Sequence, residues 1–243
     1  ITESDSTWHG ACLALAELAR RGLLLPSQLA ETIPLIVEAL TYDVRRGPHS
    51  VGSHLRDAAC YVCCAFARAY APDVLTPYVN EIAPSLLMVA CFDREVNCRR
   101  AASAAFQESV GRLSQFPHGI DIVTIADYFS LGAKVHASLT VAPYICRFDE
   151  YRVPMLEHIL DAKLTHWEHS SRLLATQTVG VLGDLDPHWI LDIGLPTVLD
   201  RACHAGLPTR HGAILAIGGM ILVAHRANLT PCLEARKKVA DVI

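Results

Sequence analysis

Apolar residues recur along the chain with the period of an α-helix. In the segment 29–40 they return at steps of three and four, which places them on one face of a helix. The same spacing appears in 55–69, 102–113 and 174–185. Runs of alternating apolar and polar residues bounded by turns are not found, and neither Asn-Gly nor Asp-Gly occurs. The pattern therefore predicts an all-α protein.

The helices repeat in register. In four segments an Arg is followed three positions later by an Ala: Arg56 and Ala59, Arg99 and Ala102, Arg172 and Ala175, Arg210 and Ala213. Trp8 and Ala11 fit the same place, and successive Ala lie 48, 43, 73 and 38 residues apart. The interval of 73 is close to two units, the missing one being a degenerate hairpin near 134–148. A period of about 40 with two helices per unit is typical of HEAT and armadillo repeats.

We therefore expect an all-α solenoid of the HEAT or armadillo type with about five to six helical hairpins. Residues 1–243 would form a single array cut from a longer solenoid, with partial repeats at both ends. Its hairpins are expected at roughly 27–71, 73–113, 121–147, 152–184 and 188–226. Their second helices are expected near 54–71, 95–113, 134–147, 168–184 and 208–226, with a further one at 8–22. The longest connection, 41–53, includes Arg45, Arg46 and Pro48 and is expected to be an exposed loop.

Composition narrows the possible partners. Hydrophobic residues make up 51% of the chain and charged residues 19%, which excludes disorder. Asp and Glu number 25 against 21 Lys and Arg, and both halves are mildly acidic, so a nucleic-acid-binding field or a polybasic membrane patch is not expected. The longest uncharged apolar stretch, 212–224, has 13 residues and is too short to span a bilayer.

The nine cysteines indicate a reduced compartment. Their number is odd, and most occupy core-like helical positions, unlike the loop cysteines of a secreted disulfide framework. Cys60, Cys63 and Cys64 form a C-x-x-C-C, but no second pair follows at metal-finger spacing, which favours packing over metal binding. Phosphate-binding loops and nucleophile elbows are also missing from the sequence.

We therefore expect no cofactor, no metal and no catalytic residue, and hence no enzyme. An enzyme with a cysteine or histidine site is the alternative from another class. Rapid alkylation of one cysteine at neutral pH, well above the other eight, would favour it.

Arginine is the characteristic charged residue, with 17 Arg against four Lys. The Arg of each repeated segment is expected to pair with an Asp of the neighbouring repeat and so form a ladder. Arg100 lies outside this register. The segment 93–100 is dense in charge at a helix start, where Asp93 can act as a cap. It would offer planar bidentate donors to the carboxylates of a partner.

Two further segments carry open alternatives. The connection 116–121 either presents His118 on a surface loop or forms a tight turn with Asp121 as a cap. Tyr128 and Phe129, at a helix end, are expected to belong to the core.

Several strings resemble the tubulin-folding cofactor D family. They are WHGACLALAEL at 8–18, SVGSHLRDAACYVC at 50–63 and NCRRAASAAFQE at 97–108, followed by FPHGID at 116–121 and ADYF at 126–129. The resemblance covers residues 8 to about 130. Beyond residue 131 it is limited to His166-Trp167 and Arg210-His211-Gly212.

The resemblance implies a large HEAT-repeat chaperone that is cytoplasmic and associated with the cytoskeleton. Such a chaperone captures β-tubulin and, with cofactors C and E and an Arl-type small GTPase, assembles and disassembles the α/β-tubulin heterodimer. The family drives GTP hydrolysis on tubulin as an assembly, with the catalytic Arg attributed to cofactor C, so we expect no catalytic Arg in this chain.

Partner-facing or loop-ordering residues are expected in the charged segment and the loops near it. They are Asp93, Arg94, Asn97, Arg99, Arg100, Gln107, Glu108, His118 and Asp127, with Arg45 and Arg46 as second choices. The alternative is a HEAT adaptor of the transport or phosphatase type with a different partner. Such an adaptor would carry acidic residues or Trp/Asn arrays at repeat spacing, and the sequence has none.

Overall fold

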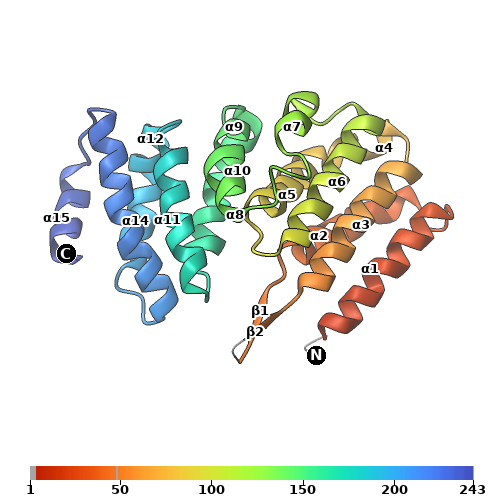
Figure 1. The fold of residues 1–243 in the computed structure, drawn as a ribbon, viewed down its shortest axis with the longest axis horizontal. Coiled ribbons are helices and arrows are strands. Elements are labelled where there is room, and N and C mark those ends of the chain that lie inside the picture. The colour runs from red at the N-terminus through yellow and green to blue at the C-terminus, as the bar shows by residue number, and fades with distance from the viewer. Residues whose placement is uncertain (1–3, 48, 243) are drawn as a thin grey trace. The chain divides into compact units, whose positions relative to one another are not determined.

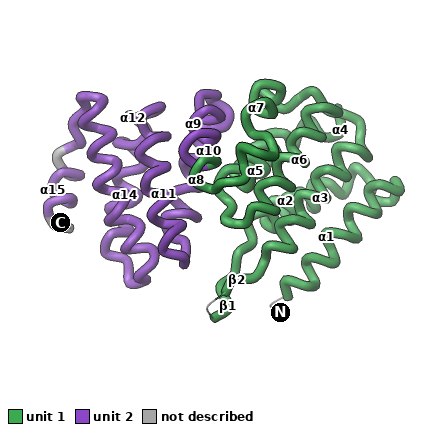
Figure 2. Tube along the Cα trace, in the orientation of Figure 1, with its two compact units in different colours: residues 1–137 green, residues 138–243 purple. Residues whose placement is uncertain are grey.

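The computed structural model describes residues 4–47 and 49–242. Their contacts divide the chain into two compact units, residues 1–137 and 138–243 (Figure 2). Helices dominate both units, which confirms the predicted all-α class (Figure 1).

Unit 1 consists of helices and one short hairpin. In chain order its elements are α1 (Asp5–Arg20), η1 (Pro26–Gln28), α2 (Leu29–Thr41), β1 (Val44–Arg46), β2 (His49–Val51), α3 (Ser53–Ala69), α4 (Pro72–Leu75), η2 (Thr76–Tyr78), α5 (Val79–Phe92), α6 (Val96–Leu113), α7 (Gly119–Ile125) and α8 (Lys134–His136).

The long helices of unit 1 form two layers. Helices α1, α3 and α6 lie side by side in one layer, while α2 and α5 pack against them and against each other in the second (Figure 1). Apolar side chains fill the space between the layers, among them Leu29, Leu55, Phe66, Leu86 and Phe106. Burial of these faces is the main stabilising contribution, since a buried Leu or Phe side chain contributes about 1.5–3 kcal/mol.

The connection expected to be an exposed loop contains a β-hairpin. Strands β1 and β2 pair antiparallel, with Val44 opposite Val51. Gly52 ends the hairpin at a φ of 124°, and a Cβ atom there would collide with the Tyr42 carbonyl oxygen. Pro48, at the tip, lies outside the described residues. Alternation over three residues is too short to show as a strand pattern, so the sequence did not reveal this hairpin.

Unit 2 continues with shorter helices. Its elements are η3 (Ala137–Val141), whose first residue ends unit 1, α9 (Ala142–Ile145), α10 (Asp149–His158), η4 (Ile159–Lys163), α11 (His169–Gly183), α12 (Pro187–Trp189), η5 (Ile190–Gly194), α13 (Leu195–Arg201), α14 (Leu207–Arg226) and α15 (Leu233–Val242). Helix α14 packs against α11, η5 and α13, and α11 packs against α9 and η4.

Three turns of π-helix interrupt unit 2, at η3, η4 and η5. Pro143 follows η3 and Pro196 follows η5. A proline removes one backbone N–H and its ring clashes with the carbonyl four residues earlier. In both cases the carbonyl that has lost its helical N–H donor to the proline lies within the π turn. The proline therefore gives a physical reason for each of these two interruptions.

The helices expected at 54–71, 95–113, 168–184 and 208–226 are α3, α6, α11 and α14, with ends within two residues of the prediction. The helix expected at 134–147 is divided among α8, η3 and α9. How the helices group into repeats, and the single array over 1–243, stay predictions.

The repeated Ala positions are mostly buried contacts. Ala59, Ala102, Ala175 and Ala213 are all buried, which explains why a small residue recurs there. Ala11 departs from the pattern, because it is exposed while the adjacent Cys12 is buried.

Two segments, Pro72–Phe92 and Leu207–Arg226, are long and apolar enough to cross a membrane by length and composition. Most of the first is buried among the neighbouring helices of unit 1, as in a core helix, whereas 39% of the second is buried. The absence of a membrane span therefore stays a prediction.

Candidate protein-binding surface

One face of unit 1 is formed by the outward sides of α1, α3 and α6. We call it the second-helix face. On α6 this face carries the small residues Ala101, Ala104 and Gly111 between longer polar side chains of the same helix. Small side chains leave the surface hollowed between the longer side chains on either side.

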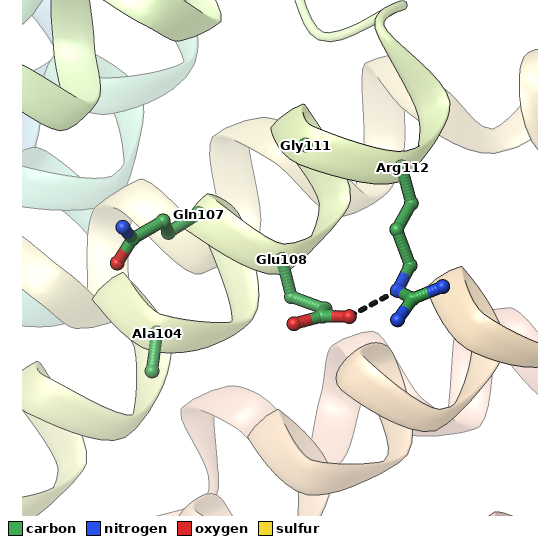
Figure 3. A pocket seen from close by; sticks show the side chains of 5 residues that line it. All are labelled: Ala104, Gln107, Glu108, Gly111 and Arg112. Carbon is green, nitrogen blue, oxygen red and sulfur yellow. Dashed lines mark hydrogen bonds and ion pairs between the residues drawn. The ribbon is translucent and has the colours of Figure 1, made fainter.

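Two open hollows meet on this face at Ala104. The first has a volume of about 320 Å³ and is lined by His9, Leu13, Asp57, Ala58, Cys60, Tyr61, Cys64, Ala101 and Ala104. The second, of about 560 Å³, is lined by Ala104, Gln107, Glu108, Gly111 and Arg112 (Figure 3). Leu13 and Tyr61 are exposed, so the first hollow offers apolar surface to a partner.

Charged side chains gather toward the C-terminal ends of the three helices, and two of them, Glu108 and Arg112, line the second hollow. We call this set the arginine rim and define it as Glu17, Arg20, Arg21, Arg68, Glu108 and Arg112. Arg20 and Arg21 both pair with Glu17, at 3.7 and 2.5 Å. Arg20 also donates a hydrogen bond from Nη1 to the hydroxyl of Tyr61 at 3.0 Å, which connects α1 to α3.

Glu108 joins α3 to α6 in the same way. Its carboxylate accepts two hydrogen bonds from Arg68, from Nε at 2.9 Å and from Nη2 at 3.1 Å. It also pairs with Arg112, four residues later on its own helix (Figure 3). Hydrogen bonds from Arg68 and Arg112 lower the pKa of Glu108 to about 2, so the group is ionised at neutral pH.

The structure places the predicted site residues in several locations. Gln107 and Glu108 line the second hollow, whereas Asn97 is exposed at the start of α6. Arg45 and Arg46 lie on β1, where Arg46 pairs with Asp5 at 3.2 Å.

Asp93 and Arg99 are buried, so of the two roles expected for them, facing a partner or ordering a loop, the structure favours the second. Asp93 is 5% exposed and Arg99 is 2% exposed. Asp93 forms an ion pair with Arg56 at 2.6 Å and accepts the backbone N–H of Glu95 at 2.8 Å. The helix is capped at Glu95, and Asp93 instead orders the turn before it.

Arg99 orders the same turn through carbonyl oxygens. Its Nη1 donates to the carbonyls of Asp93 and Arg94 at 2.9 and 3.0 Å. Its Nε and Nη2 donate to the carbonyls of Leu131 and Gly132 at 2.8 and 2.7 Å. Burial lowers the pKa of Arg99, so the carbonyl oxygens compensate a charge that has lost its water.

The same geometry recurs at other turns, and sequence reasoning missed it. Four Arg side chains bind the carbonyls five and six residues before them: Arg99, Arg152, Arg172 and Arg210. We call this arrangement the arginine turn clamp. Of the four Arg in the repeated register, Arg56 shows the predicted pairing with an Asp of the next hairpin; the other three bind carbonyls. The acceptors are backbone carbonyls, which every residue type carries, so the acceptors themselves leave no pattern in the sequence.

The residue six positions before the Arg often supplies a second acceptor. The Nδ1 atoms of His166 and His204 accept the backbone N–H groups of Glu168 and Gly206, at 3.0 and 2.9 Å. Asp93 plays the same part with its carboxylate. An Asp or His six residues before the Arg is the one signal in the sequence that could have revealed the clamp.

Arg100 and Asp127 order a turn that ends in exposed aromatic residues. Asp127 accepts the backbone N–H groups of Phe129 and Ser130 at 2.9 and 2.6 Å, and the Ser130 bonds lower its pKa. Arg100 lies 3.7 Å from the centre of the Tyr128 ring. Tyr128 is 57% exposed and Phe129 is 84% exposed, so the prediction that both belong to the core is wrong.

Arg94 and His118 complete the predicted set. Arg94 donates from Nη2 to Ser50 Oγ at 2.6 Å and so ties the turn before α6 to β2. His118 is exposed and has a left-handed φ of 53° directly before α7. A turn therefore presents His118 on the surface, whereas Asp121 lies in the first turn of α7 and is not its N-cap residue.

Metal and thiol chemistry find little support in the described part of the chain. Within residues 4–47 and 49–242, no group of three His, Cys, Asp or Glu side chains could hold a metal ion. Cys60 and Cys63 are buried, and Cys64 is half-buried. Burial raises the pKa of all three, to about 11 for Cys64, which disfavours the reactive thiolate.

The helical hairpins, the clamped turns and the open face define an armadillo-type repeat scaffold. The family model described as "Tubulin-specific chaperone D-like, ARM repeats" matches residues 1–120. The chain is 42% identical over 230 residues to the Tubulin-specific chaperone D of Dictyostelium discoideum, which covers 94% of this chain. It is 31% identical over 197 residues, 81% of the chain, to the Tubulin-folding cofactor D of Schizosaccharomyces pombe.

The chain belongs to the tubulin-specific chaperone D family. It spans 16% and 18% of the length of these two relatives, so it corresponds to one segment of them. The chain also aligns with the crystal structure of an engineered protein, at 13% identity and a TM-score of 0.37. The alignment covers 91% of this chain and 93% of the engineered protein.

Proposed function

We propose that this chain is a binding segment of a tubulin-folding cofactor. In this role it helps to capture β-tubulin and, with cofactors C and E and an Arl-type small GTPase, to assemble and disassemble the α/β-tubulin heterodimer. The observation that carries the proposal is the 42% identity to a tubulin-specific chaperone D over 94% of the chain. The cytoplasm, where tubulin is assembled, is the expected location.

The second-helix face supports a role in protein binding. It combines apolar surface at Leu13 and Tyr61 with a charged rim, as protein interfaces do with their cores and borders. Its hollows are open, and a chaperone must release its client, which favours an extended polar surface over a closed pocket.

The proposal assigns no catalytic residue to this chain. The raised pKa values of the buried thiols support a non-enzymatic role. Any stimulation of GTP hydrolysis would therefore arise from the assembly of tubulin with several cofactors, with the catalytic group supplied by another chain.

Size-exclusion chromatography of the purified 243-residue chain with tubulin dimer, and separately with the GTPase, tests the proposal. We expect co-elution with tubulin at low salt that weakens at physiological salt, because exposed charge pairs are screened. Arg100→Glu should reduce co-elution, whereas Arg236→Glu, an exposed Arg on α15, should not.

No co-elution with tubulin or with the GTPase at low salt would contradict the proposal for this segment. A HEAT adaptor of another type would give the same result. Co-elution of the chain with a phosphatase catalytic subunit or a basic transport peptide would then identify that alternative.

A further inference from the structure

The arginine rim contains more positive than negative charge. Arg20 and Arg21 share the single carboxylate of Glu17, and Arg68 and Arg112 share that of Glu108. Both carboxylates are ionised, since their Arg partners lower the pKa of each. Four guanidinium groups and two carboxylates leave the rim with a net positive charge of two, although the whole chain is negative.

The shared carboxylates also hold the guanidinium groups in place. A free Arg side chain loses rotamer entropy when it becomes fixed. Because Glu108 already fixes Arg68 and Arg112, a second carboxylate can bind their remaining N–H groups at lower entropic cost. Each guanidinium has five N–H donors, and Glu108 takes two from Arg68.

The two hollows beside the rim have room for a partner polypeptide that carries such carboxylates. The second hollow is directly bounded by Glu108 and Arg112, and the first offers Leu13 and Tyr61 next to Arg20. Asp57 also lines the first hollow, but it lies near the N-terminal end of α3, whereas Arg68 lies at the C-terminal end. An apolar side chain in the first hollow would place neighbouring carboxylates over the arginines.

From this arrangement we infer that the second-helix face binds an extended acidic segment of a partner protein, with carboxylates on the arginine rim and an apolar side chain in the first hollow. The inference rests on the proposed function, because it specifies which part of a client this scaffold holds. The bidentate contact of Arg68 with Glu108 shows that the rim accommodates planar carboxylates, which favours an acidic polypeptide over a nucleic acid.

Gly111 allows a test that leaves the fold intact. A Cβ atom added there would meet nothing within 4 Å, and Gly is unfavourable inside a helix. Gly111→Glu and Gly111→Lys therefore both fill the second hollow without strain, and they differ only in the sign of the charge. Their helical content and melting curves should match or exceed those of the parent chain.

The probe is a short fluorescein-labelled peptide rich in Glu with one central Phe. Its binding to the chain is measured by fluorescence anisotropy at low and at physiological salt. We expect Gly111→Glu and Arg112→Gln each to weaken binding about ten-fold, which corresponds to about 1.4 kcal/mol. Gly111→Lys should bind at least as tightly as the parent chain. The control Arg236→Gln, and a matched peptide with Gln in place of Glu, show whether any effect is specific to the rim.

Equal binding by the Glu and Lys variants, or no binding of the acidic peptide, would overturn the inference. Binding of a single-stranded oligonucleotide in preference to the peptide would overturn it as well. The proposed function can fail separately. If the chain binds the peptide but not tubulin, the proposed function alone is overturned. If the chain binds tubulin but not the peptide, and Gly111→Glu does not change tubulin binding, this inference alone is overturned.

Discussion

Arg99 and Arg100 are adjacent in sequence and differ completely in environment. The guanidinium of Arg99 is buried and donates to four carbonyl oxygens, whereas that of Arg100 lies over the ring of Tyr128. One helical step of 100° separates them, which is enough to move a side chain from the core to the surface. Their contributions to stability and to binding must therefore differ.

Arg99→Met is expected to reduce the free energy of unfolding by about 2–4 kcal/mol, because it removes four hydrogen bonds and leaves buried carbonyl oxygens without donors. Arg100→Met loses the stacking contact with Tyr128 and one exposed hydrogen bond, from Nε to the Tyr128 carbonyl oxygen at 3.1 Å, and should change the free energy of unfolding by less than about 1 kcal/mol. Urea unfolding followed by circular dichroism compares the two variants. Equal stabilities would show that the buried hydrogen bonds of Arg99 contribute nothing.

The elements of unit 2 depend on close approach as much as on apolar burial. In α14, Gly212 lies so near the carbonyl oxygen of Leu164 that no Cβ atom fits between them. Gly218, further along the same helix, has no neighbour within 4 Å of the corresponding position. The two glycines therefore form a matched pair on one element.

Gly212→Ala is expected to lower the melting temperature and to cost more than about 3 kcal/mol of unfolding free energy, since α14 must move away from the backbone at Leu164. Gly218→Ala should instead stabilise the chain by about 0.5–1 kcal/mol, the usual gain of Ala over Gly in a helix. Thermal melts of both variants show whether each substitution raises or lowers the melting temperature. A stable Gly212→Ala variant would mean that α14 does not pack this closely.

Helical periodicity was sufficient to locate α3, α6, α11 and α14, because each buries one face over three or more turns. The same reasoning failed for Phe129. An aromatic residue after a helix resembles a core residue, and the turn that holds it outward is ordered by side chains such as Asp127, whose carboxylate binds the turn's backbone. The candidate surface was predicted only at Gln107 and Glu108, since its remaining members come together through packing of three helices.

At the scale of the whole molecule, most Arg side chains stabilise turns or join neighbouring helices. Arg226 binds Asp184, Arg201 binds Asp161, and Arg68 binds Glu108, all about 40 residues apart in sequence. Each of these contacts joins segments about one repeat period apart. Stability in a repeat scaffold is correspondingly a sum of local contributions.

Stability of the chain should fall as the pH is lowered below about 6.5, the ordinary pKa of His. Burial, Arg172 and His169 lower the pKa of His211, and burial and then Lys163 lower that of His158. Folded-state pKa values below the unfolded value give stability that is complete above pH 6.5 and is lost as pH falls toward them. Urea unfolding at pH 7.5, 6.5 and 5.5 measures the effect.

His211→Gln should reduce this pH dependence while keeping an acceptor for Arg172, which donates from Nε to His211 Nδ1 at 3.1 Å. The exposed His188 provides the matched control, and His188→Gln should leave the slope unchanged. An identical slope in the His211 variant would assign the acid sensitivity to other groups.

The arginine turn clamp has a consequence for how the chain acquires its structure during synthesis. Each clamp joins an Arg to carbonyls only five and six residues behind it, so the turn can close as soon as the following helix begins to form. Contacts of such short sequence separation have little loop-closure entropy to overcome and form quickly. A growing chain can therefore fix the direction of each clamped helix before the next helix leaves the ribosome.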